Sequence, residues 1–429
     1  MALQPVAEIR DPVHGYVKVT EVEREVIDSP FVQRLRRVHQ LAGSYLVYPG
    51  AVHTRFEHVV GTMHIAGQIG KSLASASEMD QEFVQELRLA ALLHDVGHGP
   101  FSHMFEEVLA AKGTTTHEDI TQRIILETSL GDLLRKHGFS PERTSELAVG
   151  KLNKAPSFMN EIIVGGLSAD IMDYLLRDSY FTGVEYGKVD IQRVVDSLHA
   201  PDGHLALDHA ALYTFEAMLL ARYEMFKAVY FHRTVRAAEL MLVHAMDLAD
   251  KTLGLTDLSN LDRYLDLTDE IVLQRLASID PATPELMQAK QLALDFRNRN
   301  LVKCVFERLF QRRDQAIGQL FAESRERART VAELARSAGV DPVHIFLDVP
   351  TAPSVPYTSS RQMLTSVRLI EEGDGGTTNV PIKDLPLVGS IAGFMDVLRV
   401  YASPSVRQPV KQAATTFFGT GNSFIETSV

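Results

Sequence analysis

The feature that most constrains this chain is an apolar helical stripe that leads into a His-Asp pair. Leu87 and Ala90 recur at the helical period, which predicts a helix over residues 80–96 with His94 on its buried face. Asp95 then stands near the carboxyl end of this helix, where a negative charge is disfavoured unless a cation offsets it. An isolated pair of this kind is usually a buried histidine beside a solvated aspartate.

Further histidines around the pair reverse that expectation. They are His53, His98, His103 and His117. Two of them flank a Gly/Pro loop instead of lying in a packed helix. His58 precedes the pair and Asp170 follows it, so two imidazoles and two carboxylates offer nitrogen and hard oxygen donors. These donors suit Fe, Mn, Co or Mg with positions left for water and phosphate, and they predict a divalent-metal site for phosphoester hydrolysis.

Composition narrows the class of protein. The net charge is −12 and no long basic run interrupts it, so we expect no dedicated nucleic-acid binding, which rests on lysine and arginine against phosphate. Cys304 is the single cysteine, which rules out an intrachain disulfide and a Cys-rich zinc site and fits a reducing cytoplasm. The first residues do not have the pattern of a secretory leader, and no apolar run approaches membrane-spanning length. We expect a soluble cytoplasmic protein without a membrane association.

Longer segments resemble one family. They are RDPVHGYVKV, FVQRLRRVHQLAGSYLVYPGAVHTRFEHVVGT, HDVGHGPFSHMFE and DIMDYLLRDSYFTGV. They are similar to the HD-domain deoxynucleoside triphosphate (dNTP) triphosphohydrolases, which include bacterial dNTPases and the core of the eukaryotic SAM-and-HD-domain enzyme. The resemblance is strongest over residues 8–235 and legible to about residue 350. It implies a mainly α fold, with an HD-domain helical metal-phosphohydrolase core and a smaller C-terminal α+β lobe.

The resemblance also implies the residues of the reaction centre. The implied metal ligands are His58, His94, Asp95 and Asp170. The implied catalytic residues are His98, His103, His117 and Glu106. His103 would protonate the departing deoxynucleoside 5′-oxygen, which an imidazole does well near neutral pH. The family pattern often has Asp at the position of Glu106, so a longer side chain stands there in this chain.

A third group of residues is implied to bind the substrate. Its members are Gln40, Leu41, Arg55, Tyr174, Asp178, Arg222 and Tyr230. The two arginines would hold phosphate, and the tyrosines would wall the pocket and exclude a 2′-hydroxyl. Helical spacing independently places Asp170, Tyr174, Arg177 and Asp178 on one face. The alternative is core tyrosines with peripheral charges. Ile171 replaces a phosphate-binding lysine that relatives can carry.

The last implied group is a candidate effector site. It comprises Asp28, Gln33, Arg36 and Arg299. In the family such a pocket lies between subunits and binds an activating nucleotide, so we expect a homo-oligomer, a tetramer, activated by GTP or a dNTP. Ala7 and Ala210 stand where relatives place basic residues. The alternative is that Asp28 caps the helix starting near residue 30 and the arginines are solvated.

The order of elements predicts four consecutive segments. They are an HD-type catalytic domain at 1–255, a helical extension at 256–338, an α+β lobe at 339–402 and a tail at 403–429 that is mobile or draped on a neighbouring subunit. The first contains a hairpin turning at Gly15, site helices near 54–72, 80–96, 160–180 and 208–250, and a small hairpin in LHAPDGHLALD. The lobe combines strands in VHIFLDVPTA and VRLIEEGDGGTTNVPI with a packing helix in LVGSIAGFMDVLRVYA.

Three functions compete at this point. The leading hypothesis is metal-dependent hydrolysis of dNTPs to deoxynucleoside and inorganic triphosphate, with water attacking the α-phosphorus and with activation by a nucleotide. The first alternative is another HD-domain phosphohydrolase, acting on nucleoside monophosphates, modified nucleotides or phosphodiesters. Arg55, Arg222, Gln40 and Asp178 favour the first, whereas Ile171 counts against it. The second alternative is a silent nucleotide sensor or assembly module, which the full set of ligands and histidines makes improbable.

Overall fold

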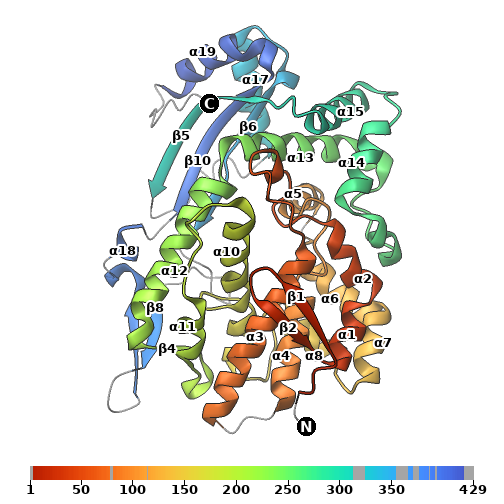
Figure 1. Cartoon of the computed structure of the whole chain (residues 1–429). Coiled ribbons are helices and arrows are strands. Elements are labelled where there is room, and N and C mark those ends of the chain that lie inside the picture. Colours follow the sequence, from red (N-terminus) through yellow and green to blue (C-terminus); the bar gives the residue numbers. More distant parts are fainter. Residues whose placement is uncertain are drawn as a thin grey trace. The chain divides into compact units, whose positions relative to one another are not determined.

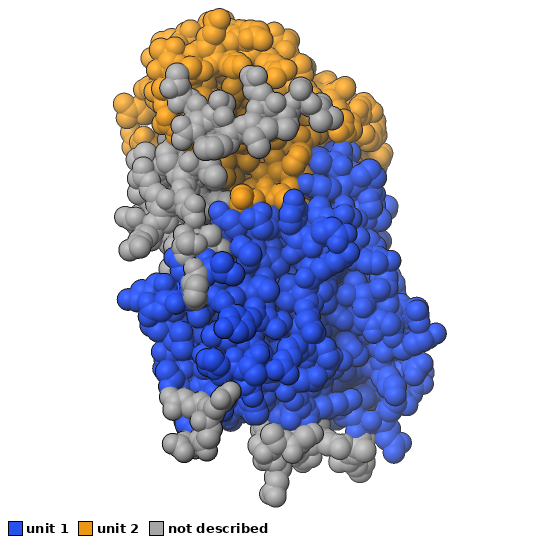
Figure 2. Space-filling model, turned by 60° about the vertical axis from the view of Figure 1, so that its left-hand side comes forward, with its two compact units in different colours: residues 1–225, 256–272, 355–390 blue, residues 226–255, 273–354, 391–429 orange. Residues whose placement is uncertain are grey.

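A computed structural model describes residues 3–77, 81–113, 115–312, 324–353, 366–370, 376–385, 387–391 and 394–419. The chain forms two units that are interleaved in sequence (Figure 2). Unit 1 contains residues 1–225, 256–272 and 355–390. Unit 2 contains residues 226–255, 273–354 and 391–429. This grouping differs from the four consecutive segments expected from the sequence.

Unit 1 is mainly helical (Figure 1). Its helices are α1 (Glu21–Ile27), α2 (Pro30–Arg34), α3 (Arg55–Ser77), α4 (Gln81–Leu93), α5 (His103–Lys112), α6 (His117–Glu127), α7 (Ser129–Lys136), α8 (Pro141–Ala148), α9 (Ser157–Ile163), α10 (Ala169–Thr182), α11 (Ile191–Asp196) and α12 (Leu212–Met225). α3 packs against α4, α10 and α11. At its start, the Thr54 backbone N–H donates to the Glu57 carboxylate at 2.9 Å, which satisfies a donor at the helix terminus.

Two small sheets complete unit 1. β1 (Ala7–Asp11) and β2 (Gly15–Val19) form the predicted antiparallel hairpin, with Gly15 at φ +76°. β3 (Leu198–His199) and β4 (Ala206–Asp208) form the second predicted hairpin. β8 (Ser366–Ile370) and β9 (Thr377–Pro381) extend it to a sheet of order β3-β4-β8-β9. β8 therefore belongs with unit 1, although the sequence placed it in a separate lobe. The predicted Gly-rich turn at 371–375 lies outside the described residues.

Unit 2 combines helices with an antiparallel sheet. Its elements are α13 (Arg233–Leu253), α15 (Pro284–Arg297), β5 (Lys303–Arg312), α17 (Ser324–Ala338), β6 (Ile345–Asp348), β7 (Thr351–Pro353), β10 (Phe394–Ala402) and α19 (Arg407–Phe418). α14 (Asp269–Ser278) connects the units along the chain. β10 is the central strand, pairing with β5 on one side and with β6 and β7 on the other. No described helix has both the length and the apolar character needed to cross a membrane.

Two sequence predictions about residues 256–402 are wrong. The helix expected over LVGSIAGFMDVLRVYA is limited to α18 (Val388–Ile391), and the rest is β10. Residues 397–402 of this strand are all buried, Arg399 included, so the segment lacks the polar–apolar alternation that identifies a half-exposed strand. Likewise, β5 lies inside the extension predicted as helical at 256–338.

The prediction of a mobile tail from residue 403 is also wrong for α19. Val410, Ala413 and Ala414 recur at helical spacing and are buried in a core cluster with Leu398 and Val400 of β10. The polar Ser/Thr/Gln composition hid this short stripe. Residues 420–429 lie outside the described residues.

Candidate metal centre

The four predicted metal ligands come together within unit 1. His58 extends from α3, His94 and Asp95 follow the end of α4, and Asp170 lies in the first turn of α10. His58 Nε2 is 3.1 Å from Asp170 Oδ1 and 3.7 Å from Asp95 Oδ2. His94 Nε2 is 3.4 Å from Asp95 Oδ1 and 3.8 Å from Asp170 Oδ1. His58, His94 and Asp95 therefore offer ligand atoms that all lie within 4.8 Å of one another, and Asp170 lies near both imidazoles.

Both imidazoles are oriented with Nε2 toward this cluster. His58 Nδ1 lies 2.8 Å from a carboxylate oxygen of Asp173, and His94 Nδ1 lies 2.7 Å from the Ala91 carbonyl oxygen. A carbonyl only accepts, so Nδ1 of His94 carries the proton and Nε2 keeps its lone pair. Among the described residues His94 Nε2 is buried and has no hydrogen-bond partner. This is the tautomer that a metal-ligating histidine requires.

The electrostatics of the cluster also suit a cation. Burial opposes a proton on His58, but hydrogen bonds with Asp170 and Asp173 outweigh it and raise the pKa of His58 to about 10. A nitrogen that holds a proton this strongly sits in a field that favours positive charge, and a divalent cation supplies that charge. A cation held by His58, His94, Asp95 and Asp170 would polarise a phosphate oxygen and lower the pKa of bound water.

Asp173, which the sequence did not single out, supports His58. Its buried carboxylate faces His58 Nδ1 at 2.8 Å, His14 Nε2 at 2.6 Å and two nitrogens of Arg177 at 2.9 Å. A Cβ at Gly61 would lie 1.9 Å from Asp173 Oδ1, so glycine is needed there for the carboxylate to approach. Arg177, expected on the pocket face, instead bonds to this carboxylate and to that of Asp11.

We expect Asp173→Asn to weaken metal binding about 10- to 100-fold, because removing the partner of a ligand disturbs its orientation and basicity. The measurement is a titration of the apoprotein with Mn²⁺ or Co²⁺ against a competing chelator. Asp196→Asn, an exposed carboxylate on α11, is the matched control. Equal metal affinity in a folded Asp173→Asn protein would contradict this role.

A second group consists of His98, His103, His117 and Glu106. The rings of His98 and His117 stack with centroids 3.9 Å apart. Glu106 lies 2.7 Å from His103 Nδ1 and also contacts His117 Nδ1, so the longer side chain bridges two histidines. Burial opposes ionisation of Glu106, but these two hydrogen bonds hold its pKa well below the usual range. The side chain of His103 is 67% exposed, which leaves its Nε2 accessible to a ligand.

The loop between the two groups is tightly constrained. Phe101 and Ser102 have φ of +58° and +57°, a region that residues other than glycine rarely adopt. At Gly97 a Cβ would lie 2.2 Å from the His117 carbonyl oxygen, so no side chain fits. Such conformations persist only where the surroundings enforce them, and they concentrate at functional sites.

Three further residues that sequence reasoning missed hold this loop. Buried Arg34 donates to the His98 carbonyl at 2.8 Å, and Tyr264 OH donates to the Gly97 carbonyl at 2.8 Å. Asp269 accepts the Phe101 N–H at 2.6 Å. Tyr264 and Asp269 lie more than 160 residues from their partners and belong to no recognised motif, so no local pattern could have found them.

Two predicted substrate-binding residues, Arg55 and Gln40, have buried polar atoms without a hydrogen-bond partner among the described residues. Arg55 is 2% exposed, pairs with Asp95 and donates to Ser102 Oγ at 2.8 Å. Its Nη2 is buried without a hydrogen-bond partner among the described residues. The same holds for Gln40 Oε1 and His98 Nδ1. Leaving such atoms unpaired costs about 1 to 3 kcal/mol each, so water or a polar ligand is expected to satisfy them.

The remaining predicted residues are placed as follows. Asp178 faces His53 Nε2 at 2.8 Å, and Tyr174 OH accepts from Arg222 Nε at 3.2 Å. Leu41 is half-buried. Tyr230 ends a π-helical turn in unit 2, so the geometry of unit 1 does not test it and it stays a prediction.

The candidate effector residues are only partly brought together. Gln33 and Arg36 bond to each other at 2.9 Å, and the Arg36 guanidinium lies 3.4 Å above the Phe56 ring centroid. Asp28 is exposed and ends α1, whereas Ser29 stands at the start of α2, so the capping alternative for Asp28 is wrong. Arg299 belongs to unit 2, and the effector site stays a prediction.

The segments that carry these residues are similar to known proteins. Residues 55–178 match the HD domain, and residues 189–372 match the HD associated region. The Bacillus subtilis protein YwfO is 31% identical over 368 residues, which is 81% of this chain and 80% of YwfO. The deoxynucleoside triphosphate triphosphohydrolase SAMHD1 homolog of Dictyostelium discoideum is 31% identical over 70% of this chain, and the match spans 60% of that protein. A hypothetical protein from Aquifex aeolicus has a similar crystal structure, with a TM-score of 0.74 and 29% identity over 95% of this chain and 99% of that chain.

Fold and site together define an enzyme of the HD-domain phosphohydrolase type, with a His/Asp cluster suited to a divalent metal. The predicted mainly α fold with a smaller strand-containing C-terminal region is confirmed. Within that class, the chain belongs to the HD-domain dNTP triphosphohydrolase family.

Proposed function

We propose that this enzyme hydrolyses dNTPs to deoxynucleoside and inorganic triphosphate. The proposal rests mainly on one observation: the metal cluster is connected both to a buried arginine, Arg55, and to the His103-Glu106 pair. Asp95 is shared between the cluster and Arg55, and the loop that carries His98 leads directly into His103. A phosphate bound at the cluster would meet a fixed guanidinium, a strong donor to phosphate oxygens. The activity in the name of the Dictyostelium relative supports a dNTP as the substrate.

Different groups would act on the two atoms of the cleaved bond, the α-phosphorus and the 5′-oxygen. Water would attack the α-phosphorus at the metal cluster, and the 5′-oxygen would leave with a proton from His103. Glu106 stays ionised, because its pKa is lowered, and therefore stabilises the protonated imidazole of His103. A general acid of this kind contributes about 10²- to 10⁴-fold to the rate.

The sugar would be recognised by Asp178 and its neighbours. Asp178 is 2% exposed and held by His53, whose ring stacks on Phe181 with centroids 4.6 Å apart. Asp178→Ala is expected to weaken use of dNTPs by about 1 to 3 kcal/mol in kcat/KM, since the 3′-hydroxyl loses its acceptor. Steady-state kinetics with dNTPs and 3′-deoxy analogues measure this, with exposed Asp196→Ala as the control. An equal loss with both substrates would show that Asp178 does not read the 3′-hydroxyl.

Ile171 favours the alternative that the enzyme hydrolyses a phosphoester other than a dNTP. Ile171, at the position of a phosphate-binding lysine in relatives, is 7% exposed and offers no charge. Fewer phosphate contacts would suit a nucleoside monophosphate or a phosphodiester. The test is incubation of the metal-loaded enzyme with the four dNTPs, ATP, GTP and deoxynucleoside monophosphates, with Mg, Mn, Fe and Co in turn. We expect turnover of dNTPs with little turnover of ribonucleotides; turnover of monophosphates alone would overturn the proposal.

We also propose that the enzyme is a cytoplasmic homo-tetramer that GTP or a dNTP activates. The activating nucleotide would bind at the effector site formed by Asp28, Gln33, Arg36 and Arg299. Exposed Asp28 offers an acceptor for a guanine edge, which supports this reading. Light scattering with and without GTP, followed by an assay of one dNTP alone and with GTP, tests it. A monomer whose activity no nucleotide alters would contradict it.

A further inference from the structure

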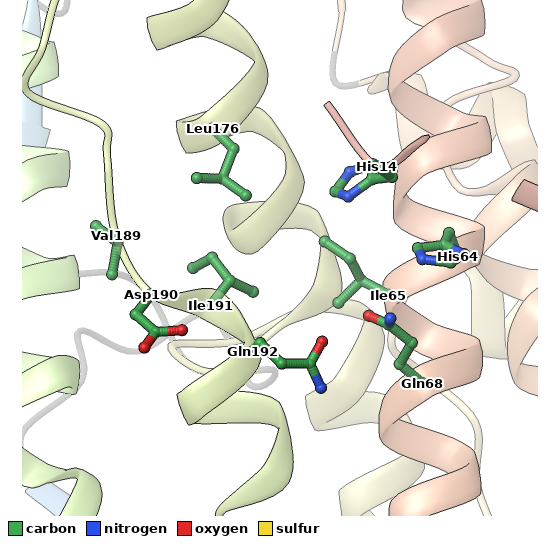
Figure 3. Close-up of a pocket in the computed structure, with 9 residues that line it drawn as sticks. All are labelled: His14, His64, Ile65, Gln68, Leu176, Val189, Asp190, Ile191 and Gln192. Atoms are coloured by element: carbon green, nitrogen blue, oxygen red, sulfur yellow. The ribbon is translucent and has the colours of Figure 1, made fainter. Parts of the chain in front are cut away.

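A pocket of about 330 Å³ lies in unit 1, lined by residues other than the proposed metal ligands (Figure 3). His14 from the β1–β2 turn and His64 and Gln68 of α3 form one side. The other side is formed by Leu176 of α10, by Val189 and Asp190 before α11, and by Ile191 and Gln192 at its start. The volume is at the small end of the range typical of ligand pockets.

The lining disfavours an anion, because Asp190 contributes a carboxylate, which accepts the Arg193 backbone N–H at 3.1 Å. None of the described lining residues is lysine or arginine, so the pocket has no strong donor for a phosphate. Burial, followed by the charge of His14, lowers the pKa of His64 to about 4, so His64 is neutral near pH 7 and offers one donor and one acceptor. The amide of Gln68 makes no hydrogen bond to another described residue. Ile65, Leu176 and Ile191 supply apolar walls.

The pocket is connected to the metal cluster through His14. The His14 ring packs against His64 with centroids 5.4 Å apart, and its Nε2 lies 2.6 Å from Asp173. Asp173 in turn lies 2.8 Å from Nδ1 of His58. A molecule that moves or bonds to His14 therefore acts on the group that orients a metal ligand.

We propose that this pocket is a second binding site, for an uncharged molecule of nucleoside size with hydrogen-bond donors and acceptors, and that its occupancy alters metal binding through His14 and Asp173. The choice of deoxynucleosides as probes rests on the proposed function, in which they are products. Binding is measured without any hydrolysis, so a failure of the pocket proposal can be distinguished from a failure of the proposed activity.

The experiment is calorimetric titration of the metal-loaded, full-length protein with each of the four deoxynucleosides. Gln68→Leu removes a free amide from the pocket, and Gln274→Leu, an exposed glutamine on α14, is the matched control. Asp178→Asn marks binding at the proposed substrate site. We expect at least one deoxynucleoside to bind the wild type and Asp178→Asn, and to bind Gln68→Leu about three- to tenfold more weakly. The hydrolytic activity of Gln68→Leu without added deoxynucleoside should equal that of the wild type.

The link to the metal is tested by repeating the chelator titration with saturating deoxynucleoside. We expect the apparent metal affinity to change about fivefold or more in the wild type and Gln274→Leu, and less at the same deoxynucleoside concentration in Gln68→Leu. If Asp178→Asn abolishes deoxynucleoside binding and Gln68→Leu retains it, the pocket is not a second binding site. The same conclusion follows if none of the four deoxynucleosides binds. Binding in the pocket with unchanged metal affinity would overturn the link.

Discussion

Asp95→Ala and His94→Ala are each expected to abolish hydrolysis and to lower the bound metal well below that of the wild type. Each removes one of four donors, which leaves the cluster underligated. Asp95 also pairs with buried Arg55, and breaking a buried pair costs about 3 to 5 kcal/mol, so Asp95→Ala tests stability as well. His94→Ala keeps the Arg55 pair and separates loss of metal from loss of fold. Elemental analysis of the purified proteins and a dNTP assay are the measurements.

The control for this pair is Asp132→Ala, a carboxylate whose side chain is 83% exposed and remote from the cluster in sequence. It should retain both metal and activity. Wild-type metal content together with wild-type turnover in either His94→Ala or Asp95→Ala would show that the cluster is not the metal site.

His103→Ala is expected to retain metal while losing about 10²- to 10⁴-fold in kcat, as the loss of a general acid predicts. The imidazole contacts Glu106 but none of the four proposed ligands, so metal content should be unaffected. A substrate whose leaving group needs no proton, such as a p-nitrophenyl phosphoester, should lose much less. His209→Ala, another exposed histidine, is the control. Loss of metal from His103→Ala would instead make His103 a ligand.

The metal centre is the part of the site that the sequence indicated best, because helical periodicity alone directed His94 inward. The chemistry of the donors pointed to His58 and Asp170, and the family resemblance implied the same two residues. In the structure His58 lies 3.7 Å from Asp95, and Asp170 lies 3.8 Å from His94. Asp173 was missed, although it stands one turn from Asp170. Its partner His14 is 159 residues away, and a contact of that kind leaves no local pattern.

The fold, like the site, could be predicted only in part from the sequence. Helices with one buried face were predictable, as were hairpins with glycine at the turn. β10 was not, because residues 397–402 of this central strand are all buried, so polar and apolar residues do not alternate there. α19 was missed for the opposite reason, since only three of its residues are buried in a polar sequence.

The central claim, cleavage between the α-phosphorus and the 5′-oxygen, is tested most directly by hydrolysis of a dNTP in ¹⁸O-labelled water. Mass spectrometry should find unlabelled deoxynucleoside and intact triphosphate carrying one ¹⁸O, because the water oxygen ends on the α-phosphorus. Labelled orthophosphate with deoxynucleoside diphosphate, or pyrophosphate with deoxynucleoside monophosphate, as the primary products would contradict the account.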